Sequence, residues 1–424
     1  MVDRKRAGGG AEAAARAIAA VWRIESAKIV ATLTRLTGDF ALAEDLAQDA
    51  LAEALEQWPD AGVPTNPAAW LTTVAKRRAV DFWRRRERLD ERVSVIAHDL
   101  RHGQDAATDA LPWDPDAIDD DVLRLIFIAC HPVLSREAQV ALTLRVVGGL
   151  TSEQIGRAFL VPVATVQQRI VRAKKTLGAA HVPFELPPRE EHRERLAAVL
   201  GVLYLVFNEA HAASSGEDWM RPDLAREAIR LTRVVAGLLP REAEAHGLLA
   251  LMELTAARFP ARIDAKGDPV LLADQDRSRW DRSAITRGLA SLARVDALNR
   301  GRGGYALQAS IAECHAIAAS VDDTDWDRIV LLYEALGKLT PSPVIELNRA
   351  AAVAMATGPA SALQIVDRLV ASGELQGYHL LPATRGELLL RLGREDEARD
   401  EFAAAARLSG NDRERALLQQ KARS

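Results

Sequence analysis

The sequence predicts an all-α protein. Alanine and leucine are abundant, aromatic residues make up only 5% of the 424 residues, and apolar positions recur at spacings of three and four. We find no convincing stretch in which apolar and polar residues alternate as they do in strands. With 48% hydrophobic and 27% charged residues, the chain is long enough for two or three domains with their own cores, which excludes a disordered chain.

Charge, cysteine content and hydropathy narrow the class of protein. The 55 Lys and Arg residues against 59 Asp and Glu give a net charge of -4, so binding to nucleic acid would need local basic charge. Cys130 and Cys314 are too few and too far apart for a disulfide framework or a thiolate metal site, and we expect neither metal nor cofactor. No apolar run approaches the roughly 20 residues of a membrane span, and the first residues do not resemble a signal peptide. We therefore expect a cytoplasmic protein without membrane contact.

The first helical segment is acidic. From Asp39 to Gln57 it carries six carboxylates and no base, and Leu42, Leu46, Leu51 and Leu55 mark its apolar face. The carboxylates either offer a surface to a basic partner or form a solvated face. Both interpretations remain open at this point.

The next helical segment, Pro67 to Arg88, is basic. The segment contains seven Lys and Arg residues and only two acidic residues, Asp81 and Glu87. Phe82 and Trp83 directly precede the arginine run at residues 84–86. Cations neutralise phosphates and aromatic rings stack on unpaired bases, so this composition suits single-stranded or melting DNA. The alternative is core aromatic residues with a solvated helix end. We predict that Trp70 is a core residue and that the arginines bind DNA.

Residues 89–121 read as an acidic flexible linker, because helical periodicity fades there and aspartate, glycine and proline accumulate. Helical pattern resumes at Val122 and continues to about Ala180. The proline-rich stretch 181–188 then marks a second boundary. Beyond residue 190 the pattern is again helical, interrupted by prolines and glycines.

A helix-turn-helix is predicted within the second helical block. Thr151 or Ser152 is a suitable N-cap, and Glu153 and Gln154 occupy the reciprocal capping positions. After a turn at residues 160–162, the helix Val163–Leu177 has apolar residues stepping by three and four. Its free face has no acid and suits a major groove. That face carries Thr165, Gln167, Gln168, Arg169, Arg172, Lys174 and Lys175.

Three stretches in this order resemble the extracytoplasmic-function (ECF) branch of the sigma-70 family of bacterial transcription initiation factors. Residues 43–51 resemble region 2.2, residues 67–85 resemble regions 2.3 and 2.4, and residues 150–175 resemble region 4.2. The resemblance implies a region 2 domain at 14–88 and a region 4 domain at 122–180. The chain differs from the family's pattern at Gln167-Gln168, where many relatives have a basic residue followed by serine. The resemblance therefore does not determine which −35 sequence is recognised.

The resemblance also implies roles for individual residues. The acidic helix would dock on the clamp coiled coil of RNA polymerase core through Asp45, Gln48 and Asp49. The loop 58–67 and the basic helix would recognise and open the −10 element of promoter DNA, through Lys76, Arg77, Arg78, Trp83, Arg84 and Arg85. The second helix of the helix-turn-helix would read the −35 element, through Thr165, Gln167, Gln168, Arg169, Arg172 and Lys175.

Residues 190–424 form an extension with signs of a helical repeat. Small and large residues at 386, 393, 398, 402 and 405 have the spacing of a tetratricopeptide (TPR) helix pair, and residues 348–362 give a degenerate copy. The extension resembles the subgroup of these factors with a long TPR-like C-terminal domain, on residues 207–209, 274–280, 307–312, 341–350 and 378–379. We hypothesise that this domain regulates the factor or stabilises its polymerase complex, and that an anti-sigma or other regulatory protein binds it.

We expect no catalytic residues. Glu209 and His211 are separated by about 200° around a helix, which makes joint metal binding awkward, and no HExxH or nucleotide-binding motif occurs. The segment Asp274–Trp280 is either a contact with a partner or a structural salt-bridged turn.

Two functions remain open. The first is a promoter-specificity subunit of RNA polymerase with a regulatory helical domain. The second is a helix-turn-helix regulator with a ligand- or protein-sensing repeat domain that never joins polymerase. The acidic helix at 39–57 favours the first, because a simple repressor needs no docking surface for the clamp.

Overall fold

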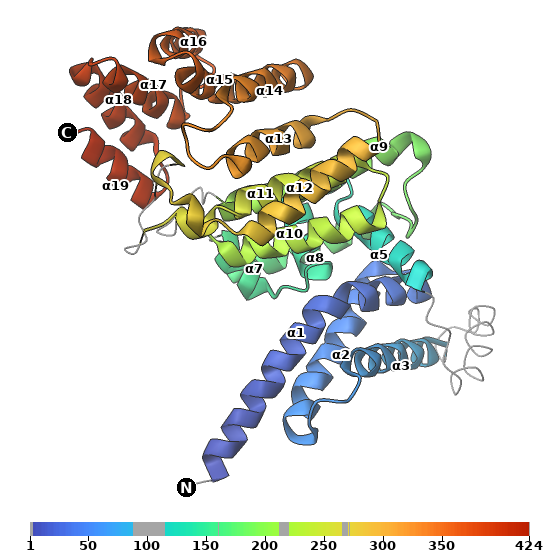
Figure 1. The fold of residues 1–424 in the computed structure, drawn as a ribbon. Coiled ribbons are helices and arrows are strands. Elements are labelled where there is room, and N and C mark those ends of the chain that lie inside the picture. The colour runs from blue at the N-terminus through green and yellow to red at the C-terminus, as the bar shows by residue number, and fades with distance from the viewer. Residues whose placement is uncertain are drawn as a thin grey trace. The chain divides into compact units, whose positions relative to one another are not determined.

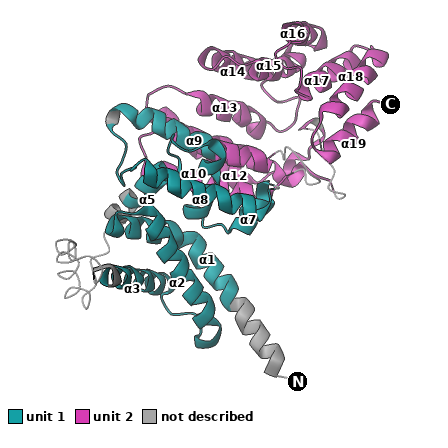
Figure 2. Cartoon of the chain, turned by 180° about the vertical axis from the view of Figure 1, so that it is seen from behind, with its two compact units in different colours: residues 1–202 teal, residues 203–424 magenta. Residues whose placement is uncertain are grey.

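The computed structural model describes residues 3–87, 115–159, 161–211, 220–264, 270 and 272–423. The chain forms two compact units, residues 1–202 and 203–424 (Figure 2). Helices supply the regular structure of both, which confirms the all-α prediction. Within the described residues, none of the helices combines the length and apolarity needed to cross a membrane.

Three helices build the first half of unit 1: α1 (Asp3–Thr37), α2 (Phe40–Ala61) and α3 (Pro67–Glu87). Helices α2 and α3 both pack against α1 (Figure 1). The Asp39 side chain caps α2 by accepting hydrogen bonds from the backbone N–H groups of Ala41 and Leu42. The shared core contains Ile18, Trp22, Ile29 and Leu33 of α1, Leu46 of α2, and Leu71 and Val74 of α3.

The buried face of α2 differs from the predicted leucine face. Leu46 is buried but Leu55 is 49% exposed, and the contact is made mainly by alanines at positions 43, 47, 50 and 54. Their small side chains allow α1 and α3 to approach closely. The next position in this series, Trp58, is also buried.

The predicted loop 58–67 is shorter than expected, because α2 continues to Ala61 with Pro59 inside it. Burial of Trp58 holds this last turn in place, and its ring meets the partly buried Trp70 edge to face at 5.3 Å. The connection between α2 and α3 is therefore confined to residues 62–66.

The second half of unit 1 contains α5 (Pro115–Ala129), α6 (Arg136–Val146), α7 (Ser152–Phe159), α8 (Val163–Ala179) and the start of α9 (Arg189–His211). Helix α5 begins at Pro115, not at Val122, since proline suits the first turn of a helix. Asp121, predicted as the end of the linker, is a buried carboxylate that accepts from Arg35 at 2.7 Å and Arg124 at 2.6 Å. The rest of the predicted linker, residues 89–114, lies outside the described residues.

Unit 2 begins within α9, and its described residues continue through ten further α-helices with three short 3-10 turns. They are α10 (Pro222–Leu238), α11 (Ala243–Ala256), η1 (Phe259–Ala261), η2 (Leu272–Asp274), η3 (Arg277–Arg279), α12 (Arg282–Ala297), α13 (Gly304–Ile317), α14 (Trp326–Leu339), α15 (Pro343–Ala356), α16 (Pro359–Ser372), α17 (Leu380–Arg391), α18 (Glu395–Leu408) and α19 (Asp412–Lys421). From α13 onward, each helix packs against the next one in the chain.

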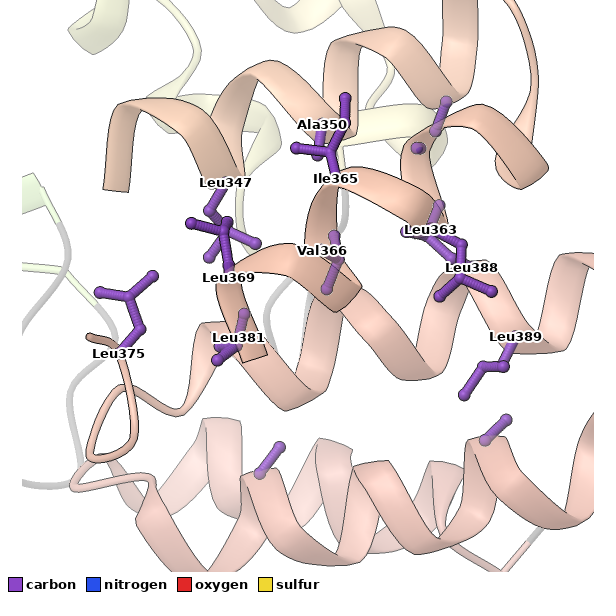
Figure 3. Close-up of a cluster of buried hydrophobic side chains, with 14 of the residues drawn as sticks. Leu347, Ala350, Leu363, Ile365, Val366, Leu369, Leu375, Leu381, Leu388 and Leu389 are labelled. Atoms are coloured by element: carbon purple, nitrogen blue, oxygen red, sulfur yellow. The ribbon is translucent and has the colours of Figure 1, made fainter. Parts of the chain in front are cut away.

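The last five helices share one apolar core, part of which Figure 3 shows. Leu347 and Leu369 belong to α15 and α16, and Leu388 belongs to α17. Helices α17 and α18 approach closely because Gly386 faces Phe402: a Cβ at Gly386 would lie 2.9 Å from the Phe402 ring. The predicted small and large residues at 386 and 402 therefore do meet.

Replacing Phe402 by Ala should destabilise this core. The side chain is 1% exposed, so the change leaves a cavity and should lower the free energy of unfolding of unit 2 by about 3–5 kcal/mol. Hydrogen exchange of peptides from α17 and α18 measures this loss of stability as reduced protection of their amides. Leu390→Ala is the matched control, because Leu390 is 46% exposed and its loss should cost less than about 1 kcal/mol. Equal protection in both variants would contradict the packing described.

Candidate nucleic-acid interface

Helices α7 and α8 form the predicted helix-turn-helix. The N-cap is Thr151, and the capping box is reciprocal: Gln154 N–H donates to Thr151 Oγ1 at 3.2 Å, and Thr151 N–H donates to Gln154 Oε1 at 2.8 Å. Between the helices, Val161 N–H donates to Gly156 O at 2.9 Å and closes the turn. These local bonds fix the start of α7 and the turn that leads into α8.

Helix α8 has one buried and one exposed face. The buried stripe is Val166, Ile170, Ala173 and Leu177, as the spacing predicts. On the other side, Gln167, Gln168, Arg172 and Lys175 are exposed, and Thr165 and Arg169 are partly exposed. All six predicted −35 residues thus lie on one helix, which has no carboxylate.

The prediction assigns Val171 to neither face of α8, and Lys174 departs from its predicted place. Val171 is 50% exposed between Gln167 and Lys175, one helical turn from each, and its apolar side chain was not singled out. Val171 lies outside the three-and-four spacing of the buried residues, and that spacing is the sequence signal for its exposure. Lys174, predicted on the free face, is only 15% exposed, because its ammonium group contacts Glu44 and Asp45 of α2.

Helix α3 carries the predicted −10 residues with different exposures. Arg77 and Arg84 are exposed, whereas Lys76 and Trp83 are partly buried. Burial, together with the nearby Arg35 charge, lowers the pKa of Lys76. The Trp83 ring lies edge to face with Phe82 at 5.8 Å. The Arg85 side chain lies outside the described residues.

Arg78 contacts the acidic helix. Its guanidinium donates to Glu53 Oε2 at 2.7 and 3.2 Å and lies 3.4 Å from Asp49 Oδ2. The structure therefore brings together a residue predicted to bind DNA and one predicted to bind polymerase. In this arrangement Arg78 joins α3 to α2.

The three predicted polymerase-binding residues lie on the outer side of α2. The Asp45 and Asp49 side chains are 70% and 60% exposed, and Gln48 is partly buried. Glu44, beside them in sequence, is 3% exposed and belongs to the interior of unit 1. Glu44 is one of the six carboxylates between Asp39 and Gln57, and the composition of that segment does not predict its burial.

The remaining candidates in unit 2 have structural partners. Glu209 accepts from Arg221 at 2.7 Å, and the His211 ring stacks on Phe207 with 6.0 Å between centroids. Burial, with the charges of Arg262 and Arg258, holds the pKa of His211 well below its usual value. A search of the described residues finds no cluster of His, Cys, Asp and Glu suited to a metal ion.

The segment Asp274–Trp280 is an ordered structural turn. Arg277 is 8% exposed and donates to the carbonyls of His315 and Ala318, both at 2.8 Å, near the end of α13. Its guanidinium also lies 5.1 Å from the centre of the buried Trp280 ring. These contacts favour the structural interpretation over a partner contact.

Three parts of the chain match known families. Residues 24–89 match sigma-70 region 2, residues 124–177 match sigma-70 region 4, and residues 195–296 match a family of unknown function, DUF6596. The chain is 43% identical over 399 residues to an uncharacterized protein of Rhizobium meliloti (strain 1021), covering 91% of this chain and 90% of that protein.

Named relatives cover the first half. A probable ECF RNA polymerase sigma factor SigI of Mycobacterium tuberculosis is 27% identical over 177 residues, which is 42% of this chain and 59% of the relative. The ECF RNA polymerase sigma factor SigL of the same species is 28% identical over 173 residues, 41% of this chain and 93% of the relative.

This chain has regions 2 and 4 of a sigma-70 factor, and it belongs to the ECF branch of the sigma-70 family. It is an RNA polymerase sigma factor with a helical C-terminal extension, in a family whose members are not enzymes. Membership implies RNA polymerase core and promoter DNA as partners. The alternative, a regulator that never joins polymerase, is set aside.

Replacing Arg78 by Met should weaken the packing of α3 on α2. The side chain is 37% exposed, so solvent screens the ion pair with Glu53 and the expected loss is about 1 kcal/mol of unfolding free energy. Arg77→Met, on the exposed side of the same helix, should change stability by less than about 0.5 kcal/mol. Thermal denaturation of the two variants measures the difference. An equal effect on both would contradict the structural role of Arg78.

Proposed function

We propose a division of labour within this sigma factor: α8 reads the −35 element, α3 binds and opens the −10 element, and α2 docks on the clamp coiled coil of polymerase. The observation that carries the proposal is the exposed face of α8. It is basic, lacks carboxylates and follows a capped helix and tight turn. That geometry suits insertion into a major groove.

The exposed side chains of α8 suggest what they recognise. Gln167 and Gln168 can each pair with adenine through two hydrogen bonds, and Arg172 can pair with guanine or hold a phosphate. Val171 offers an apolar contact for the methyl group of thymine. Thr165, Arg169 and Lys175 complete the surface, with Arg169 and Lys175 adding positive charge toward the DNA backbone.

On α3, the cations and the Phe82–Trp83 pair serve the melted strand. Arg77 and Arg84 are exposed for phosphate contacts, and aromatic rings beside them can stack on an unpaired base. Lys76 and Arg85 belong to the same proposed surface. Arg78 contributes by holding α3 against α2.

For polymerase docking, Asp45 and Asp49 present carboxylates on the outer side of α2, and Gln48 lies between them. Complementary charge would steer a basic partner to this surface.

The C-terminal unit is proposed to be a TPR-like regulatory domain that binds a protein partner. Its paired helices and the Gly386–Phe402 contact support the repeat. A groove of about 630 Å³ is lined by apolar and charged residues of α14, α15 and α16, among them Tyr333, Ile345 and Leu369. Leu331 and Leu339 of α14 are 64% and 57% exposed. Exposed apolar residues of this kind suit a protein contact.

Transcription in vitro tests the whole proposal. Purified full-length protein and core polymerase are combined with a library of genomic fragments, and start sites are mapped. We expect initiation at a set of promoters sharing −35 and −10 elements. A protein that neither binds core nor directs initiation from any fragment would refute the assignment of α2, α3 and α8.

Replacing Arg172 by Ala should weaken −35 binding and, if the guanidinium contacts a phosphate, reduce the slope of log affinity against log salt by about one. Fluorescence anisotropy of a −35 duplex between low and moderate salt measures both quantities. Arg193→Ala is the control, because Arg193 is exposed on α9 outside the helix-turn-helix. An unchanged affinity and slope would remove Arg172 from the interface.

Removing the C-terminal unit should change promoter output if that unit is regulatory. The stop belongs after His211, because α9 is held by unit 1: Arg195 donates to Phe127 O at 3.1 Å. Transcription by this short form is compared with that of the full chain at equal polymerase occupancy. Identical output would assign the C-terminal unit to another task.

A further inference from the structure

A group of basic side chains surrounds Trp280 in unit 2. Arg258 follows α11 and Arg277 lies in η3, and their guanidinium carbons are 5.5 and 5.1 Å from the centre of the Trp280 ring. His315 of α13 belongs to the same group, because Arg277 donates to its carbonyl at 2.8 Å. We call these four residues the Trp280 cluster. Three of them are buried, and Arg258 is partly exposed.

The two arginines of the cluster have neutral acceptors. Arg258 Nε donates to Gln275 Oε1 at 3.3 Å. Arg277 donates to two backbone carbonyls and, at 3.1 Å, to Thr324 Oγ1. In the part of the chain that the structure describes, neither guanidinium has a carboxylate within ion-pair distance, and the Asp323 charge attracts Arg277 only from farther away. Two positive charges are therefore held close together without a counter-ion, which is unfavourable where water is excluded.

The pKa values of the arginines show this mutual repulsion. Burial and the charge of Arg277 lower the pKa of Arg258 to about 10. Burial and the charge of Arg258 lower the pKa of the neighbouring Arg262 to about 9. All three guanidinium groups remain cationic at neutral pH. A negative charge placed among them would therefore be attracted by each one.

The cluster also contains hydrogen-bond donors without acceptors. Six buried side-chain polar atoms of the described residues have no hydrogen-bond partner, and three of them belong here: Arg277 Nε, Trp280 Nε1 and His315 Nδ1. Buried donors nearly always have an acceptor, because an unmade bond leaves the loss of hydration uncompensated. Guanidinium and indole groups can only donate, and a neutral imidazole donates from Nδ1 when that atom carries the proton. The missing acceptor is therefore an anion rich in oxygen.

We propose that the Trp280 cluster binds a phosphate group, either free or carried by a small metabolite. Phosphate oxygens accept from the fork of a guanidinium and from neutral N–H groups, and a phosphate charge between −1 and about −2 at neutral pH matches two arginines. Arg258 is the member that a ligand reaches first, because it is partly exposed. Most of the cluster lies within residues 195–296, the segment that matches DUF6596. The inference gives this segment a small ligand beside the protein partner proposed for unit 2.

Calorimetric titration of the full-length chain, without polymerase or DNA, tests the site. Inorganic phosphate and glycerol phosphate are titrated separately, at constant ionic strength set with chloride. We expect saturable binding with a dissociation constant below about 1 mM. Tighter binding of glycerol phosphate would support a phosphate carried by a metabolite, whereas equal or weaker binding would support free phosphate.

Hydrogen exchange locates the bound phosphate. Saturating phosphate should slow exchange in peptides that cover residues 272–281 and 304–317, because these contain η3 and α13. The basic helix α8 is the competing location, since it also carries exposed cations. Protection confined to α8 would place the phosphate on that helix and would overturn the proposal.

Two variants remove ligands of the phosphate. Arg258→Gln should weaken binding at least about tenfold, because charge-assisted hydrogen bonds are lost. Phosphate should raise the thermal midpoint of the parent and leave that of Arg258→Gln unchanged. Trp280→Phe keeps an aromatic ring and deletes one donor, so it should weaken binding about threefold. Arg279→Gln is the matched control, because Arg279 is an exposed arginine of the same turn. Its affinity for phosphate should equal that of the parent.

The opposite results are equally distinct. Equal affinity in the parent, Arg258→Gln and Trp280→Phe, or heats that never saturate, would show an adventitious ion only and refute the site. An equal loss of affinity in Arg279→Gln and Arg258→Gln would reduce the effect to general surface charge and also refute it. Circular dichroism confirms that each variant is folded, and Trp280→Phe decides the matter if Arg258→Gln is not. Because polymerase and DNA are absent, failure here leaves the proposed promoter function intact.

Discussion

Glu44 is 3% exposed, and the cations it contacts, Arg145 and Lys174, come from the other half of unit 1. Removing an ion from water costs several kcal/mol, so a carboxylate in this position requires partners. Because the partners belong to α6 and α8, satisfying the Glu44 charge constrains the position of the helix-turn-helix relative to α2. These ion pairs therefore link the acidic helix α2 to the helix-turn-helix half of unit 1, beside the packing of α1 against α5.

The same logic explains how a chain with net charge -4 serves as a DNA-binding protein. Cations and carboxylates are segregated by helix, so α3 and α8 are basic while α2 is acidic. Some of these charges are paired within the protein: Arg78 binds Glu53, and Lys174 binds Glu44. What remains exposed on α8 is Gln167, Gln168, Arg172 and Lys175. The DNA-facing charge is thus smaller and more local than the count of bases suggests.

Sequence reasoning was most successful where structure is local. The capping pair Thr151–Gln154 and the stripe from Val166 to Leu177 depend on neighbours within one or two turns, and both were predicted. The roles of Lys174 and Arg78 were missed, because their partners lie 130 and 25 residues away. The buried face of α2 was also misjudged, since alanine is compatible with either environment and gives a weaker signal than leucine.

In unit 2, arginines are structural. Trp280 is 3% exposed and lies between two guanidinium groups, those of Arg258 at 5.5 Å and Arg277 at 5.1 Å from its centre. Burial and these two cations lower the pKa of His315 to about 3, so its imidazole is neutral at physiological pH and adds no further charge. Backbone carbonyls at the end of α13 complete the hydrogen bonding of Arg277. These cations stabilise the segment matched by the family of unknown function. Since Arg277 is held inside the unit, its guanidinium stabilises the fold and is not exposed to a partner.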